Sequence, residues 1–244
     1  MSLAVFLHDD VAGAAVGSSL LLDGDEGRHA ATVKRIRVGE QVVITDGAGT
    51  SAVCSVTEAA KSSLSLVVDS TSFVERAMPQ VTVVQALPTG DRGELAVEVL
   101  TEIDVDRIVP WAASRSVAVW KGERAAKGLA KWRATAREAT KQARRSWLPE
   151  VSELASTDDI VGLIASADVA LVLHEDASEP LAAVPFDGAS SIVVIVGPEG
   201  GISDDELAAF AGARAVRLGS SVLRTSTAGV AAVAAILART SRWR

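Results

Sequence analysis

The sequence lacks tyrosine altogether and contains only four phenylalanines, five tryptophans and one cysteine among its 244 residues. Because 48% of the residues are hydrophobic but so few are aromatic, the core must consist mainly of aliphatic side chains. The single cysteine, Cys54, excludes a disulfide framework and a multi-cysteine metal site, and it is typical of a reducing compartment. No zinc-binding spacing such as H-E-x-x-H occurs, so we expect no metal.

Long apolar runs are also missing. The first ten residues, MSLAVFLHDD, have no basic region and reach acidic residues after a short apolar stretch, unlike a secretory signal. The longest weakly polar run, near residues 228–238, is too short to span a bilayer. Together with the single cysteine, these absences predict a cytoplasmic protein.

The charge is unevenly distributed. A net charge of −7 argues against the binding of nucleic acid. However, residues 121–145 hold nine basic residues and two glutamates, and residues 28–37 hold four basic residues and no acid. Local basic patches attract phosphate backbones, although a charge run is more often a solvated helix face. If the two stretches bind an anionic partner such as a nucleic acid, the residues concerned are Arg28, His29, Lys34, Arg35 and Arg37 in the first, and Lys131, Arg137, Lys141, Arg144 and Arg145 in the second.

Hydrophobic periodicity predicts two domains. Residues 1–72 are rich in valine with partial alternation, which predicts a small β-rich domain, and residues 73–79 form the expected linker. From residue 80 to 244, strand and helix patterns alternate, which predicts a mostly parallel sheet covered on both faces. In the first domain we expect strands at 41–47, 51–59 and 63–70, and before them a short helix that carries basic residues. In the second domain we expect strands at 81–87, 107–113 and 168–175 and helices at 93–103, 123–144 and 158–166, with Leu95, Val99 and Ile103 on one face of the first helix.

The segment from Ser191 to Leu237 carries the strongest functional signal. The loop GPEGG (197–201) directly follows the buried strand SIVVIV, and Ser203 with Glu206 predicts a capping box for the next helix. Glycines let the backbone approach a ligand, and ligands bind at the carboxyl ends of strands in open α/β sheets, although an ordinary strand-to-helix turn looks the same. The phosphate-binding patterns G-x-G-x-x-G and G-x-x-x-x-G-K-[ST] are absent, which disfavours a nucleotide held by its pyrophosphate.

A second polar loop, LGSSVLRTSTAG, precedes the final apolar helix. Thr225 or Ser226 is expected to cap that helix, whereas Arg224 has no obvious structural task and suits an anion or an electron-rich transition state. His174 and Glu175 end another strand, where they either act as a base or line a pocket and meet solvent. No G-x-S-x-G elbow is present, which argues against a serine hydrolase.

Taken together, these stretches resemble the ribosomal RNA small subunit methyltransferase E family, within the knotted SPOUT class of RNA methyltransferases. The likeness covers nearly the whole chain and runs in order through GDEGRHAATVKRIRVGEQV, VVQALPTGDRGELAVEVLTEIDVDRIVP, LVLHED, GPEGGISDDEL and RLGSSVLRTSTA. Two departures are visible. The family usually has two adjacent histidines where this chain has Arg28 and His29, and a glutamate where this chain has Ser226.

The resemblance implies an α/β fold, with a C-terminal SPOUT-type domain that contains a trefoil knot at about 191–237 and a small N-terminal PUA-like β-barrel that binds RNA. It also implies a homodimer, formed through the SPOUT domain, that methylates N3 of uridine 1498 in the 16S rRNA of the small ribosomal subunit. Small residues on the last helix suit either a subunit interface or an intramolecular contact: Ala228, Gly229, Ala231, Ala232 and Ala235.

S-adenosyl-L-methionine is the implied cofactor, held by three loops mainly through backbone groups, with Leu218, Val222 and Leu223 around the adenine. The expected catalytic cations are Arg224 and then Arg115, which would stabilise negative charge on O2 and O4 of the uracil. Glu199 either accepts the N3 proton or holds its own loop. The residues expected to bind the cofactor are Leu173, His174, Gly197, Glu199, Gly200, Gly201, Leu218, Gly219, Ser221, Val222, Leu223 and Thr225.

Three other functions stay open at this point. The chain could be a non-catalytic RNA-binding or ribosome-assembly protein on the same fold, which would need no open cofactor pocket. It could be a methyltransferase of the same class that acts on another RNA or on a ribose hydroxyl. It could also be a small-molecule α/β enzyme that uses the pocket alone.

Overall fold

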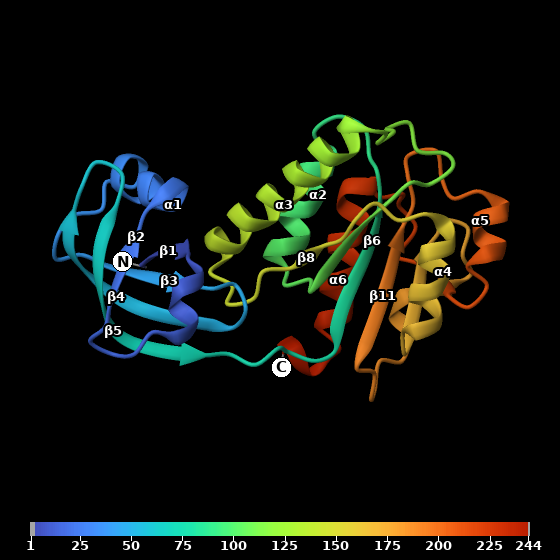
Figure 1. The fold of residues 1–244 in the computed structure, drawn as a ribbon. Helices are drawn as coiled ribbons and strands as arrows, with labels where there is room; N and C mark the ends of the chain where they lie inside the picture. The colour runs from blue at the N-terminus through green and yellow to red at the C-terminus, as the bar shows by residue number, and fades with distance from the viewer. Residues whose placement is uncertain (1–2, 244) are drawn as a thin grey trace. The chain divides into compact units, whose positions relative to one another are not determined.

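The computed structural model describes residues 3–243, and the chain divides into two compact units (Figure 1). The first unit contains the described residues up to Arg76 together with Thr140–Leu148. The second contains Ala77–Ala139 and the described residues from Pro149 onward. Among the described residues, no helix has the length and hydrophobicity that a membrane crossing requires.

The first unit is built on a five-stranded sheet with the order β1-β3-β4-β5-β2. Only β1 and β3 pair in parallel, and the other neighbours are antiparallel. Register shifts between β4 and β5 are bulges that bend the strands, so the sheet curls around an aliphatic core. The three strands predicted in this domain are confirmed. The bounds are Ala4–Leu7 (β1), Ser19–Leu22 (β2), Gln41–Thr45 (β3), Thr50–Ala59 (β4) and Leu64–Phe73 (β5).

A short basic helical segment connects β2 with β3, as the sequence predicts. Helix α1 (Gly24–Arg28) continues into a π-helical turn, η2 (His29–Val33), and a shorter turn, η1 (Asp9–Gly13), lies between β1 and β2. Gly27 has to be glycine, because a Cβ there would lie 2.4 Å from the carbonyl oxygen of Leu22. This contact fixes α1 against the edge of the sheet.

Residues 140–148 belong to the first unit, whereas the division made from the sequence places all of 80–244 in the second domain. The backbone N–H of Leu148 donates to the carbonyl of Gly47 at 2.8 Å, and the Trp147 indole donates to the carbonyl of Val74 at 2.8 Å. Gly49 packs so closely on Trp147 that a Cβ would lie 2.7 Å from the ring. Periodicity shows that this stretch ends a helix but not which core that end joins.

The second unit contains a seven-stranded sheet with the order β10-β12-β9-β11-β6-β7-β8, in which every pair is parallel. The predicted parallel sheet is confirmed. The strands are Gln80–Ala86 (β6), Arg107–Trp111 (β7), Glu150–Val151 (β8), Val169–Leu173 (β9), Glu179–Pro180 (β10), Ser191–Val196 (β11) and Arg214–Arg217 (β12).

Helices cover both faces of this sheet, with α2 and α6 on one side and α4 and α5 on the other (Figure 1). Gly229 lets α6 approach closely, since a Cβ there would lie 3.3 Å from both Leu100 and Val196. Gly229 and Ala232 are therefore used in intramolecular packing, while Ala235 is exposed. The helices are Arg92–Glu102 (α2), Glu123–Ala143 (α3), Thr157–Ser166 (α4), Asp204–Ala209 (α5) and Thr225–Leu237 (α6), with short 3-10 turns at Leu181–Ala183 (η3) and Ser241–Trp243 (η4).

The face that α2 buries differs from the predicted one. The sequence indicates Leu95, Val99 and Ile103, but Leu95 is 44% exposed and the other two are half-buried. Apolar residues occur on more than one side of this helix, so periodicity alone does not select the side that packs on α6. The buried residues are Gly93, Ala96, Val97, Leu100 and Thr101.

Candidate functional site

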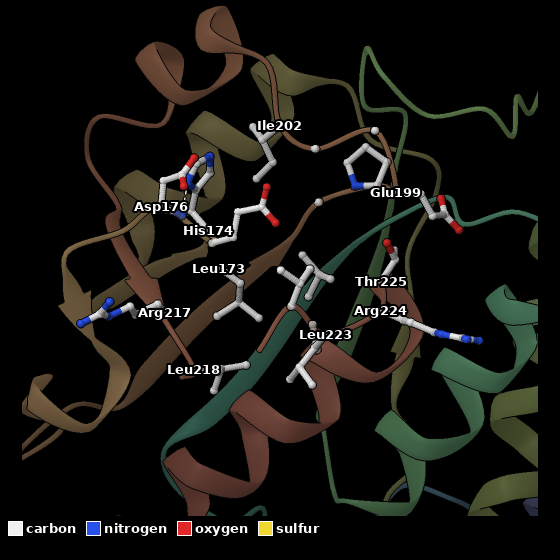
Figure 2. A pocket seen from close by; sticks show the side chains of 18 of the residues that line it. Leu173, His174, Asp176, Glu199, Ile202, Arg217, Leu218, Leu223, Arg224 and Thr225 are labelled. Atoms are coloured by element: carbon white, nitrogen blue, oxygen red, sulfur yellow. Dashed lines mark hydrogen bonds between the residues drawn. The ribbon is translucent and has the colours of Figure 1, made fainter. Parts of the chain in front are cut away.

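A pocket of about 670 Å³ opens at the carboxyl ends of β9, β11 and β12 (Figure 2). These strands are neighbours in a parallel sheet, so the loops that follow them meet at one edge. The N–H of His174, which follows β9, also donates to the carbonyl of Val216 in β12 at 3.0 Å. All of the residues that the sequence analysis selected for the cofactor line this pocket, as do Arg115, Glu199 and Arg224.

The GPEGG loop leaves no room for side chains at two of its glycines. A Cβ on Gly197 would lie 2.7 Å from Cγ1 of Ile202, and a Cβ on Gly200 would lie 2.8 Å from the carbonyl oxygen of Arg115. Gly201 has a φ of +74°, a backbone angle that residues with a Cβ rarely adopt. The glycines thus bring the backbone of this loop to the pocket wall.

The predicted capping box at the start of α5 is confirmed. Ser203 accepts from the N–H of Glu206, and the Glu206 carboxylate accepts from the N–H and hydroxyl of Ser203. Its other oxygen accepts from the N–H of Ser114 at 2.7 Å. Burial would raise the pKa of Glu206, but these hydrogen bonds outweigh burial and hold the pKa below its ordinary value. A buried carboxylate therefore joins α5 to the loop that follows β7.

That loop carries Arg115 to the pocket. Arg115 donates to the carbonyl of Ile202 at 3.4 Å, and the adjacent Ser114 is held by Glu206. Further along the loop, Trp120 packs edge-on against Trp132, with ring centres 5.1 Å apart. Both ends of the loop are anchored, so the backbone position of Arg115 is well defined.

Glu199 holds two loops together. Its Oε1 accepts from the backbone N–H and from the hydroxyl of Thr89, both at 3.1 Å, and lies 4.0 Å from Arg92. Burial would raise the pKa of Glu199, but the hydrogen bonds from Thr89 and the charge of Arg92 lower it below its ordinary value. A carboxylate with a lowered pKa is a weaker proton acceptor. The geometry therefore favours the loop-holding interpretation of Glu199.

Arg224, rather than Thr225 or Ser226, is the N-cap residue of α6, so the predicted cap is wrong. The helix begins one or two residues earlier than the capping pattern suggests, and Thr225 and Ser226 lie buried in its first turn. The carbonyl of Arg224 accepts from the N–H groups of Thr227 and Ala228 at 2.9 Å each, which fixes the backbone. Its side chain is exposed, extends from the start of α6 (Figure 2), and makes no ion pair within residues 3–243.

His174 is oriented by its own loop. Its Nδ1 accepts from the N–H of Asp176 at 3.2 Å, so the neutral imidazole carries its proton on Nε2. Nδ1 is therefore occupied, which favours a pocket-lining role over a base. The apolar residues expected around an adenine are less enclosed, since Val222 is 73% and Leu223 is 39% exposed.

Four further charged residues, which were not expected at the site, line the pocket. Arg92 follows β6 and begins α2, so the same rule about the carboxyl ends of strands would have found it. Asp176, Asp204 and Arg217 lie within the stretches LVLHED, GPEGGISDDEL and RLGSSVLRTSTA, but no role was expected of them. Arg217 is directed away from the other labelled residues (Figure 2).

The chain matches two family models. One describes an RNA methyltransferase domain and matches residues 75–237, and the other describes an RNA methyltransferase PUA domain and matches residues 22–69. The ribosomal RNA small subunit methyltransferase E of Mycobacterium bovis is 48% identical over 233 residues, which cover 93% of this chain and 89% of that protein. The chain belongs to the ribosomal RNA small subunit methyltransferase E family.

Solved structures support this assignment to the methyltransferase E family. The methyltransferase E of Neisseria gonorrhoeae, bound to S-adenosyl methionine, has a TM-score of 0.87 at 27% identity and covers 97% of this chain and 98% of that one. A putative methyltransferase of Legionella pneumophila, in complex with the same cofactor, has a TM-score of 0.89 at 26% identity and covers 98% of each chain. The pocket lies wholly inside the matched methyltransferase domain.

In this member of the methyltransferase E family, the expected RNA-binding residues of α3 need a correction. Lys141 and Arg145 are each only 9% exposed. The Lys141 ammonium lies 2.8 Å from the Glu26 carboxylate inside the first unit, so this cation serves the fold. Lys131 is exposed but pairs with Glu94 at 2.8 Å. Arg137 is half-buried and Arg144 is exposed.

The expected RNA-binding residues of the PUA domain lie mostly at the surface. Arg28, Lys34, Arg35 and Arg37 are exposed. His29 is half-buried and contacts Phe6 edge-on, with ring centres 6.2 Å apart. The matched PUA region therefore presents a basic segment to solvent.

Proposed function

We propose that this protein transfers the methyl group of S-adenosyl-L-methionine to N3 of a uridine in 16S rRNA, at the position of the family's target. The observation that carries this proposal is the convergence of three loops and Arg224 on one pocket. Relatives whose names state small-subunit rRNA as substrate, and similar structures that hold the same cofactor, support it. The reaction would take place in the cytoplasm, with the protein as a homodimer through its second domain.

The residues of the pocket fit this cofactor. Its volume of about 670 Å³ suits a ligand of nucleoside size. A Cβ on Gly197 or Gly200 would collide with Ile202 or with the Arg115 carbonyl, so backbone rather than side chains lines this part of the pocket and would contact the cofactor. The cofactor supplies a methyl group on a positively charged sulfur. The protein binds and orients the cofactor and the acceptor base, and it excludes water from them.

Arg224 is assigned to the acceptor base. N3 of uracil carries a proton and becomes nucleophilic only when that proton is transferred to solvent water and the negative charge left on the base spreads to O2 and O4. A guanidinium on a fixed backbone, with no carboxylate partner among the described residues, is suited to stabilise that charge. Arg115, whose backbone is anchored by its loop, is the second cation for this role.

Glu199 is assigned to positioning. Its Oε1 is engaged by Thr89 and Arg92, and its lowered pKa makes it a weak acceptor for the N3 proton. It joins the GPEGG loop to the turn before α2 and so keeps the pocket wall in place. Ser226, which stands where the family usually has glutamate, is 4% exposed and adds no acid to the pocket.

The target base has to leave any helix it occupies, because N3 faces the pairing partner in a duplex. Exposed basic residues of the PUA domain would position the RNA through phosphates and leave the selection of the base to the pocket. The trefoil knot at about 191–237 and the homodimer stay predictions. Sedimentation of the purified protein tests the dimer.

The decisive experiment is methyl transfer from labelled cofactor to purified small subunits, naked 16S rRNA and tRNA, followed by mass spectrometry of the nucleosides. We expect 3-methyluridine in the small-subunit rRNA. Methylation of tRNA or of a ribose would replace the proposed reaction by another of the same class. Binding of rRNA without any transfer or cofactor binding would identify an assembly protein, and turnover without RNA a small-molecule enzyme.

A further inference from the structure

The two basic stretches differ in how their charges are neutralised. Along α3, side chains pair with carboxylates one after another: Lys127 with Glu123 at 3.7 Å, Lys131 with Glu94 at 2.8 Å, Arg133 with Glu153 at 2.9 Å and Lys141 with Glu26 at 2.8 Å. An ion pair leaves a cation with less attraction for an incoming phosphate. The longer stretch, with a local charge of +7, is therefore the weaker anion site.

In the shorter stretch, Arg28 pairs with Asp25 at 3.5 Å, but the other three basic residues keep their charges. Lys34, Arg35 and Arg37 are exposed, and within residues 3–243 no carboxylate lies within 4.0 Å of their charged groups. The nearest acid in the sequence, Glu40, accepts a hydrogen bond from the backbone N–H of Arg37 at 2.9 Å. Three cations over four residues thus face solvent without an ion-pair partner.

Two large apolar side chains bracket these cations. Val33 is 67% and Val38 is 61% exposed, although the exposure of an apolar side chain to water is unfavourable in free energy. Neither joins the aliphatic core of the first unit, whereas the intervening Ile36 packs against that core. An exposed apolar pair inside a basic segment is suited to a partner that is both anionic and partly apolar.

The backbone of this segment is fixed before any partner binds. The N–H of Lys34 donates to the carbonyl of His29 at 2.9 Å, which closes the π-helical turn, and the N–H of Ile36 donates to Ala30 at 3.1 Å. Arg35 adopts a φ of +56°, in a region that non-glycine residues rarely occupy. Strained residues and π-helical turns gather at functional sites, because a pre-organised surface loses less entropy on binding.

We propose that residues 33–38 are an RNA-contact surface in which Lys34, Arg35 and Arg37 bind phosphates while Val33 and Val38 pack against riboses and base faces. This inference rests on the proposed function, because it takes rRNA as the partner. Charge complementarity selects a polyanion, and RNA offers apolar sugar and base surfaces between its phosphates. The cations supply a salt-dependent part of the affinity, and the valines supply a part that salt does not change.

The two parts can be separated by titration of 16S rRNA at several salt concentrations. We expect V33S/V38S to weaken binding roughly tenfold at every salt concentration, with an unchanged slope of log affinity against log salt. We expect K34Q/R35Q to make that negative slope less steep by about 1.5, because two phosphate contacts are lost. V16S is the matched control, because Val16 is also 67% exposed in the same unit, and it should bind as the unmodified protein does.

The proposal is overturned if V33S/V38S binds naked rRNA like the unmodified protein, or if V16S loses as much affinity. A loss of affinity for assembled small subunits but not for naked rRNA would also overturn it and point to a ribosomal protein as the partner. All of the altered side chains are exposed, so urea unfolding should show unchanged stability. Methyl transfer by the unmodified protein is measured separately. If the variants show the expected changes in rRNA affinity but the unmodified protein transfers no methyl group, the proposed function is contradicted and the RNA-contact surface is still supported.

Discussion

Single residues around the pocket fall into two groups, those whose charged ends are engaged and those whose charged ends are free. The carboxylates of Glu199 and Glu206 each accept several hydrogen bonds that fix loops. Arg224 has a backbone fixed by α6 and a side chain with no ion pair among the described residues. This division assigns the first two residues to architecture and the third to the substrate.

Replacement of Arg224 by alanine should lower the rate of methyl transfer by about 100-fold, because the charge on the uracil would lose its stabilising cation. Cofactor affinity should stay within about twofold, since the loops bind through backbone groups. R217A is the control, as it removes a guanidinium from the same pocket that is directed elsewhere (Figure 2). Single-turnover kinetics and calorimetry give the two quantities. Unchanged turnover, or a parallel loss of cofactor binding, would contradict the assignment.

Individual helices are held in place by polar contacts that can be predicted only in part from the sequence of the helix itself. The N-terminus of α5 is predictable from Ser203 and Glu206, but the hydrogen bond from Ser114 to Glu206 joins residues that are 92 positions apart. The C-terminal end of α3 shows the reverse case, because its basic side chains are visible in the sequence and their burial is not.

Stability at the N-terminus of α5 should depend on pH. The pKa of Glu206 is lower in the folded protein than its ordinary value of 4.5, so its contribution is present above pH 4.5 and is lost as the pH falls through the lowered folded pKa. E206Q should therefore lower the free energy of unfolding by about 1–3 kcal/mol at pH 7. Urea unfolding of both proteins from pH 7 to pH 3 checks this, since the other carboxylates cancel in the difference. A gap that stays constant below pH 4.5 would rule out the ionised carboxylate as its source.

Replacement of Lys141 by methionine should act on stability. The Glu26 carboxylate would remain buried without this cation, which costs about 3 kcal/mol. K127M is the control on the same helix, because Lys127 is exposed and its pair with Glu123 contributes little. Thermal or urea unfolding gives the stability, and rRNA titration should show equal affinity for folded K141M and K127M. A specific loss of affinity in folded K141M would restore Lys141 as an RNA contact.

Arg242, which lies after α6, holds several parts of the second unit together. Arg242 donates to Asp106 at 2.5 Å and to the carbonyl of Pro79 at 3.0 Å, and it also pairs with Asp104. Asp106 in turn accepts from the N–H of Val81 at the start of β6. The segment after α6 is therefore bound to the residues at the start of β6 and immediately before β7.

Removal of this contact should destabilise the whole unit rather than one element. R242M leaves Asp106, which is 7% exposed, without its cation, and we expect a loss of about 3 kcal/mol in the free energy of unfolding. R124M, at an exposed position on α3, should cost less than about 0.5 kcal/mol. Hydrogen exchange should show faster opening of β6 and β7 together. Protection that is lost only in residues 241–243 would show that the end of the chain frays independently.

Much of this architecture could be predicted, because the hydrophobic period of each strand and helix is a local property. The longer strands of both domains, the parallel sheet and the capping box of α5 follow from residues that are neighbours in the sequence, whereas the short strands β1, β2, β8 and β10 were not predicted. The pocket could also be predicted in outline, since loops after adjacent parallel strands must meet at one edge. Arg92 was missed although it obeys the same rule and lies in a stretch that carries the family resemblance, because its turn, PTGDR, was interpreted only as a connection between strand and helix.

The sequence by itself determined the longer helices and strands, their order and the positions of the polar loops, because these depend on patterns within a few residues. Only the tertiary structure decided which face of α2 is buried, which unit holds residues 140–148, and which basic side chains meet solvent. Packing and ion pairing join residues that are far apart in the chain, as Lys141 and Glu26 are. Lys34 and Lys141 are the same amino acid in two basic stretches, and their surroundings make one a surface cation and the other part of the core.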